Sequence, residues 1–135
     1  MSGATLTIAH HIATARDEDI PAAARRAAER SLLDAVGVML GATTLGEGCG
    51  AFADIAETSP GPCMLLGRAA RVQPLQAALA NGALAHAMDY EDALDGAPVH
   101  PNAAVVPVAM ALAEADASIT GAEFITAVAL GCDFT

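Results

Sequence analysis

The sequence predicts an all-α protein, and two features of its composition support this fold class. Hydrophobic residues make up 54% of the 135 residues, yet the chain has only one Tyr, three Phe and no Trp. Most apolar side chains are therefore those of Ala, Val, Leu and Ile. Alanine is the best helix former because it loses no side-chain entropy on folding. Apolar residues also recur at helical spacing, and the length corresponds to one domain with a single core.

Three helices are expected in the first part of the chain. Regularly spaced apolar residues predict a short helix over about residues 4–15. A second helix should begin at Ile20 and Pro21, because proline suits a first helical turn and the acidic run before it suits the positive end of the helix dipole. Its apolar face continues to about Gly41. Residues 47–57 predict a third helix.

The middle of the chain is expected to contain a turn and then a long helix. The run Ser59–Pro62, rich in proline and glycine, predicts the turn. The short apolar run 63–66 that follows predicts a small strand or an extended segment. Pro74 opens a helix whose apolar face is expected to continue to Met88 or Asp89.

A loop over about residues 90–101 precedes two further helices. The first is expected over residues 103–115, with Asn102 as its cap. The second begins at Thr120, whose spacing to Glu123 is that of a capping box.

The charge of the chain excludes several classes of partner. The net charge is −10, and all six cationic residues are Arg. Such a chain repels nucleic-acid phosphates and anionic lipid surfaces, so we expect neither nucleic acid nor membrane as a partner. The three cysteines lie far apart without CxxC spacing, which argues against a disulfide framework. The N-terminus does not resemble a signal peptide, and we expect a cytoplasmic protein.

The segment from His86 to Asn102 is where the sequence concentrates unlike ionisable groups between apolar helices. His86 and Asp89 are three residues apart and could share one helix face, and His100 returns just before the next helix. One interpretation makes His100 a general acid or base near neutral pH, oriented or tuned by Asp89. Two alternatives remain open, namely purely structural roles for these residues, and a metal site formed by His86, Asp89 and His100.

Several stretches of the sequence resemble the MmgE/PrpD family. Residues 32–38, LLDAVGV, are similar to that family's LLD-x-x-G segment. Residues 77–92, AALANGALAHAMDYED, are similar to its AA-x-x-NG-x-x-AH-x-LD stretch, which continues with an aromatic residue and two further positions that are mostly acidic. Residues 100–102, His-Pro-Asn, correspond to its HPS. The chain departs from the family at Ala93, where a threonine is usual, and the likeness covers almost all of the chain.

The resemblance implies a fold and a chemistry. It implies the N-terminal part of a large helical domain that is usually found in a homodimer, together with an α/β lid domain that is absent here. The family comprises lyases and isomerases of small polycarboxylates, such as 2-methylcitrate dehydratase, cis-aconitate decarboxylase and iminodisuccinate epimerase. It implies Asp89 and His100 as catalytic residues that need no metal or cofactor. We place His86, Asp92 and Asn102 beside them as substrate-binding candidates.

The end of the chain suggests that residues 1–135 are an incomplete domain, because the sequence stops within an apolar helical pattern. The chain also has no Lys, although a polycarboxylate needs cations to bind. We therefore expect the 135 residues alone to be inactive. The alternatives are a non-catalytic helical module that associates with a partner chain, a related decarboxylase or epimerase, and a metal-dependent hydratase.

Overall fold

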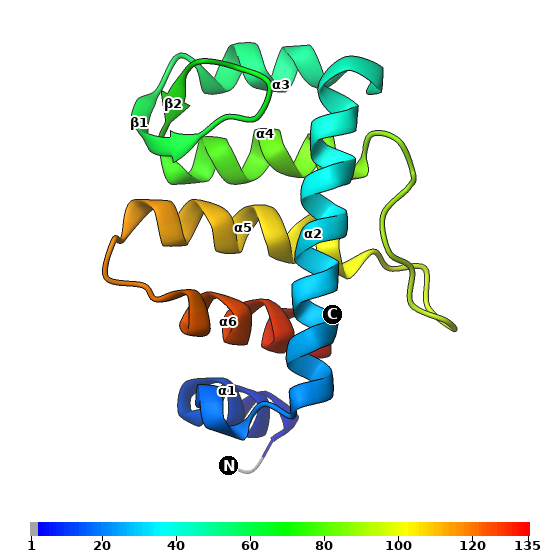
Figure 1. Ribbon diagram of the computed structural model, residues 1–135, viewed down its shortest axis with the longest axis vertical. Helices are drawn as coiled ribbons and strands as arrows, with labels where there is room; N and C mark the ends of the chain where they lie inside the picture. Colours follow the sequence, from blue (N-terminus) through cyan, green and yellow to red (C-terminus); the bar gives the residue numbers. More distant parts are fainter. Residues whose placement is uncertain (1–2) are drawn as a thin grey trace.

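The computed structural model describes residues 3–135 and is mainly helical, as the sequence predicts (Figure 1). The elements follow one another in the order α1 (Ala4–Thr14), the short 3-10 helix η1 (Asp17–Asp19), α2 (Ala22–Leu45), α3 (Cys49–Ala56), β1 (Pro60–Met64), β2 (Arg71–Val72), α4 (Pro74–His86), α5 (Pro101–Ala115) and α6 (Gly121–Asp133).

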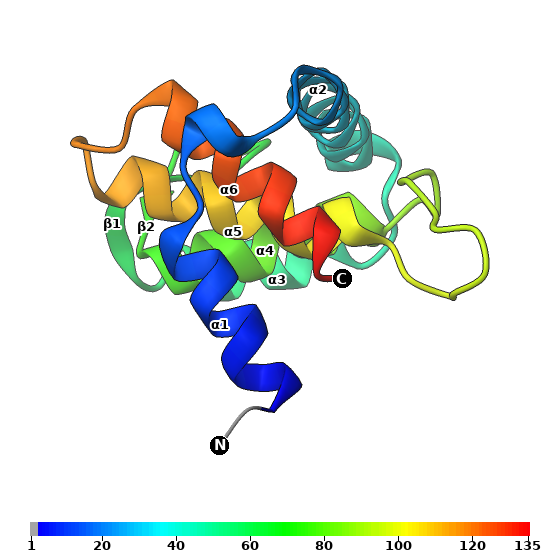
Figure 2. The same cartoon turned by 90° about the horizontal axis from the view of Figure 1, so that it is seen from below.

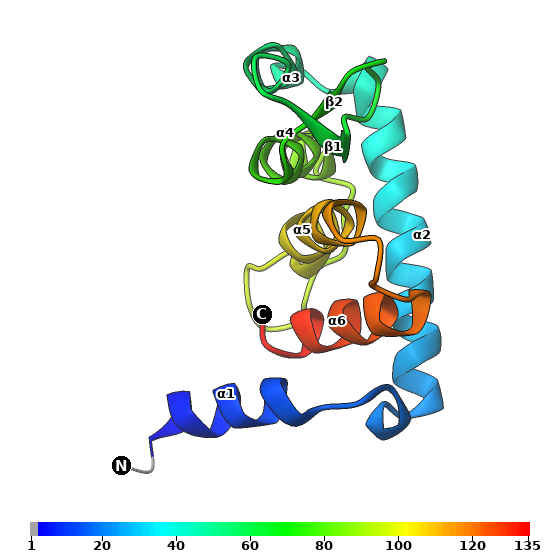
Figure 3. The same ribbon diagram turned by 90° about the vertical axis from the view of Figure 1, so that its left-hand side faces the viewer.

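Helix α2 crosses one side of a stack formed by α3, α4, α5 and α6 (Figures 1 and 3). With 24 residues it is about 36 Å long, enough to contact α4, α5 and α6 in turn. The main core lies between α2 and this stack and includes Met39, Leu84, Val106 and Val128, all buried. Much of the remaining core is alanine, whose small side chain lets neighbouring helices approach closely.

A two-stranded hairpin lies at the N-terminal end of α4. The expected turn at Ser59–Pro62 is wrong, because Pro60 begins β1, which pairs antiparallel with β2 through an irregular register between Pro60 and Cys63. The side chains of Cys63 and Val72 are fully buried against α4 and α5, and this burial favours a strand over an open turn. Proline is tolerated here because the strand has only one neighbour.

The helices before the site agree with the sequence in type and differ in length. The helices expected over 4–15 and 47–57 are confirmed as α1 and α3. Helix α2 runs on to Leu45, past the expected end near Gly41. Helix α4 ends at His86, before Met88 and Asp89, which we expected to belong to it.

The two C-terminal helices are also confirmed. The capping box of α6 is present, because the Oγ1 of Thr120 accepts from the backbone N–H of Glu123 and the Glu123 carboxylate accepts from the N–H of Thr120. The expected cap of α5 is wrong: His100 occupies the N-cap position, and Asn102 is the second residue of the helix. The reason is Pro101, since proline is strongly favoured as the first residue of a helix.

Helix α1 extends away from the body of the molecule (Figure 2). It has no buried residue, and η1 connects it to the rest by contacts to α6. In the described part of the chain, no helix is by itself long and apolar enough to cross a membrane. Helices α2 and α3 taken together would meet the requirements of length and composition, but the chain bends by 100° between them.

Candidate acid–base site

Asp89, Asp92 and His100 lie on the loop of residues 87–100, between α4 and α5 and away from the hairpin, and the helix residues His86 and Asn102 flank this loop (Figure 1). The loop begins where α4 ends at His86, and Asp89 then adopts a left-handed conformation with φ of 54°. Aspartate tolerates this conformation better than most residues. Asp89 therefore lies outside the helix, and the expected helix face shared by His86 and Asp89 is wrong.

His100 is held in a defined orientation by the backbone. Its Nδ1 lies 2.7 Å from the backbone oxygen of Asp92. Because a carbonyl oxygen can only accept, Nδ1 carries the proton in this hydrogen bond, and the lone pair of the neutral ring is on Nε2. The side chain remains 31% exposed. His100 can thus exchange a proton with a molecule outside the loop.

Glu91 is the buried acid of the site. Its side chain is only 1% exposed, and its Oε1 accepts a hydrogen bond from Nδ1 of His86. The same oxygen lies 4.0 Å from Nδ1 of His100. The two imidazole rings are 5.5 Å apart between centroids, so Glu91 lies against a histidine pair.

Several effects act on the pKa of Glu91. Burial is the largest and would raise it. Hydrogen bonds from its own backbone N–H and from His86, with the charges of the two imidazoles, outweigh burial and lower the pKa below its usual value. Glu91 is therefore an anion that stabilises positive charge on either histidine.

The structure brings four of these residues together. One ligand-type atom each from Asp89, Glu91 and His100 lies within 4.8 Å of the others, and His86 joins them through Glu91. We call Asp89, Glu91 and His100, with His86, the acid–base cluster. Sequence reasoning missed Glu91 as a site residue. The only available signal was its place in the family-like motif, because the burial of one loop acid is not visible in a spacing pattern.

Asp92 and Asn102, expected near the substrate, make contacts that hold α5. One carboxylate oxygen of Asp92 accepts from the backbone N–H of Asn102 at 2.9 Å, which satisfies a free donor in the first turn of α5. The Asn102 side chain is 1% exposed, donates to the backbone oxygen of Ser31 and accepts from the thiol of Cys132. These two residues fix the position of His100 at the start of the helix.

Two arginines close to the motif in sequence lie far from the cluster. Arg68 pairs with Asp54 and Glu57, and Arg71 pairs with Glu114, all around the hairpin. The hairpin and the cluster lie at opposite ends of α4, whose 13 residues span about 20 Å. Neither arginine can therefore clamp a carboxylate held at the cluster.

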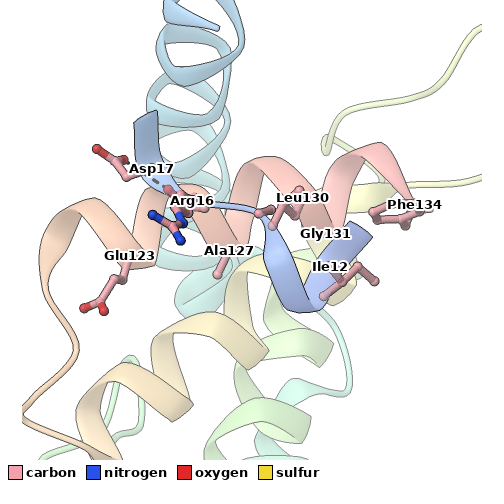
Figure 4. Close-up of a pocket in the computed structure, with 10 residues that line it drawn as sticks. Ile12, Arg16, Asp17, Glu123, Ala127, Leu130, Gly131 and Phe134 are labelled. Atoms are coloured by element: carbon pink, nitrogen blue, oxygen red, sulfur yellow. Dashed lines mark hydrogen bonds between the residues drawn. The ribbon is translucent and has the colours of Figure 1, made fainter. Parts of the chain in front are cut away.

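A cavity of about 710 Å³ lies elsewhere, between α1, η1 and α6 (Figure 4). Apolar side chains such as Ile12 and Phe134 line one end, and Arg16, Asp17 and Glu123 stand at the other. A shallower groove of about 490 Å³ on α4 and α5 reaches His86. The cluster thus adjoins an apolar groove and is separate from the cavity beside α1.

Comparison with known proteins places these observations in context. Residues 6–135 match the family described as the MmgE/PrpD N-terminal domain. No solved structure matches the chain significantly.

Two curated relatives are both named cis-aconitate decarboxylase, one from Aspergillus terreus strain NIH 2624 and one from Aspergillus terreus. Each is 29% identical over 135 residues, which cover 96% of this chain. The chain spans only 28% of the length of these relatives.

Proposed function

Because the chain belongs to the MmgE/PrpD family, we propose that it provides acid–base residues of the active site of a metal-independent lyase acting on small polycarboxylates. The observation that carries this proposal is the anchoring of His100. Its Nδ1–H is donated to the backbone oxygen of Asp92, which leaves the lone pair of the neutral ring on Nε2, and the ring belongs to the same cluster as the carboxylates of Asp89 and Glu91. Anchored in this way, the imidazole can accept a proton from a substrate or return one to it.

In the proposed dehydration His100 removes a proton at a carbon next to a substrate carboxylate, and the hydroxyl group on the neighbouring carbon leaves as water after protonation by an acid. In a decarboxylation the C–C bond to a carboxylate breaks, CO₂ leaves, and His100 returns a proton to the carbon. Glu91 stabilises the imidazolium form of His100, and Asp89, at the exposed side of the cluster, contacts the substrate. A 2-methylcitrate dehydratase-like reaction is the first candidate. Decarboxylation is the second, and the name of the two fungal relatives supports it. The proposed setting is a cytoplasmic homodimer.

The chain's own charges oppose binding of such a substrate. Its net charge is −10, and four of its six arginines, Arg16, Arg25, Arg68 and Arg71, lie in ion pairs. We propose that binding of a di- or tricarboxylate draws on further cations from another polypeptide segment. We propose that these 135 residues are inactive alone for this reason.

The test is a His100→Ala substitution in a preparation that combines this chain with the segment supplying the cations. Turnover of a panel of citrate-like acids should fall by about 100-fold or more, because general acid–base catalysis contributes that much. His11→Ala, on the exposed helix α1, is the matched control and should leave turnover unchanged. A loss of less than a few-fold for His100→Ala would remove it from this role, and inhibition by EDTA would argue against metal independence.

A further inference from the structure

The acid–base cluster also has the composition of a cation site. Asp89 and Glu91 offer carboxylate oxygens and His100 offers an imidazole nitrogen, all within 4.8 Å of one another. We propose that these three residues bind a divalent transition-metal cation such as Zn²⁺, and that the bound cation competes with proton transfer at His100. The binding does not depend on the function proposed above, whereas the competition rests on it.

A second observation points to a ligand at the same place. Oε1 of Glu91 has His86 as its partner, but Oε2 is buried and has no hydrogen-bond partner in the described part of the chain. A buried carboxylate oxygen without a partner is unfavourable, because burial removes the water that would otherwise solvate it. A cation held between Glu91, Asp89 and His100 would supply the missing interaction.

The donor set selects the class of cation. Ca²⁺ and Mg²⁺ prefer oxygen ligands throughout, whereas an imidazole with two carboxylates suits Zn²⁺ and similar transition metals. Asp89 is exposed, so a cation can reach the cluster from solvent. The net charge of −10 raises the local concentration of any cation.

A bound metal would remove the base. A neutral imidazole has one nitrogen lone pair, since its other nitrogen bears hydrogen. Whichever nitrogen of His100 binds the metal, that lone pair is no longer available to accept a proton. Zn²⁺ would therefore act as an inhibitor of the proposed reaction.

The test is a titration of the chain with Zn²⁺ in competition with a chromophoric chelator. We expect one tight site, with an affinity at least about tenfold lower in Asp89→Asn and Glu91→Gln, because even residues around a metal's direct ligands contribute 10–100-fold. Asp89→Asn keeps the backbone unstrained, since asparagine also tolerates the left-handed conformation. Asp95→Asn, an exposed acid of the same loop, removes the same charge and should bind like the unsubstituted chain.

Proton NMR of the four histidines locates the ion, since the signals of His100 should shift on adding Zn²⁺ while those of His10 and His11 stay in place. Equal affinity in all variants, or a shift confined to His10 and His11, would overturn the proposed site. That outcome leaves the proposed lyase untouched, because no substrate is involved. Turnover lost to EDTA and restored by Zn²⁺ would instead refute both metal independence and the inhibitory role.

Discussion

At the scale of single residues, Asp17 of η1 connects the N-terminal segment, formed by α1 and η1, to the rest of the protein. Its carboxylate pairs with Arg25 and accepts a hydrogen bond from Oγ1 of Thr126 on α6 at 3.1 Å. The hydrogen bond from Arg25 is the largest influence and lowers the pKa of Asp17. Burial opposes this, and the bond from Thr126 and the charge of Arg25 lower the pKa further.

We therefore expect Asp17 to make stability depend on pH. Its folded pKa is below its unfolded value of about 3.9, so its contribution is fully present above that value and is lost as the pH falls through the lower folded pKa. Asp17→Asn should reduce the difference between the unfolding free energies at pH 7 and at about pH 3. Urea unfolding at both pH values measures this.

The control for Asp17 is its exposed neighbour Glu18. Glu18→Gln removes the same charge from the same short helix and should leave the pH difference close to that of the unsubstituted chain. If Asp17→Asn and the unsubstituted chain lose equal stability on acidification, the pair with Arg25 has no energetic role.

At the scale of helices, Gly37 of α2 and Gly131 of α6 have opposite surroundings. The Gly37–Gly41 spacing in α2 suggests close helix packing. Gly41 does lie against Met88, but a Cβ at Gly37 would meet no described atom within 4 Å. Close packing occurs instead at Gly131 of α6, where a Cβ would lie 2.6 Å from Val105 of α5.

This contrast predicts stability changes of opposite sign. Gly131→Ala should destabilise the chain by about 1–3 kcal/mol, because valine in a helix is stiff and cannot move aside. Gly37→Ala should stabilise it by about 0.5–1 kcal/mol, since alanine loses less backbone entropy and meets no obstacle. Thermal and urea unfolding of both variants measure the difference. A Gly131→Ala variant as stable as Gly37→Ala would show that α5 and α6 do not approach so closely.

At the scale of the whole molecule, much apolar surface faces solvent. Leu75 and Leu79 on α4 and Leu112 on α5 are each more than half exposed, along or beside the groove that reaches His86. Monomeric proteins rarely leave so many large apolar side chains together on one face. This exposed apolar surface favours self-association of the isolated chain.

We accordingly expect the isolated chain to be marginally stable and to self-associate. Light scattering coupled to gel filtration should show species larger than 13.5 kDa that grow with concentration. Leu75→Lys and Leu79→Lys should reduce this association, while Ala51→Lys, on the exposed side of α3, should not. A monodisperse monomer that melts cooperatively would contradict the expectation.

The order and type of the helices could be predicted because the signals are local. Helical spacing, Pro74 at a helix start, and the capping box at Thr120 each act within a few residues. The hairpin could not be predicted in the same way. It depends on burial of Cys63 and Val72 against distant helices, and on Asn81, whose buried amide bonds the backbone of Met64 and Leu66.

For the site, the sequence by itself determined the family and the loop that holds the candidate residues, since the motif from His86 to Asn102 resembles the family and includes Asp89 and His100. Only the tertiary structure decided how the residues divide their roles. It placed Glu91 between two histidines and tied Asp92 to α5. The physical reason is that burial and hydrogen-bond partners in a loop depend on the helices that meet around it, and no spacing along the chain records where those helices lie.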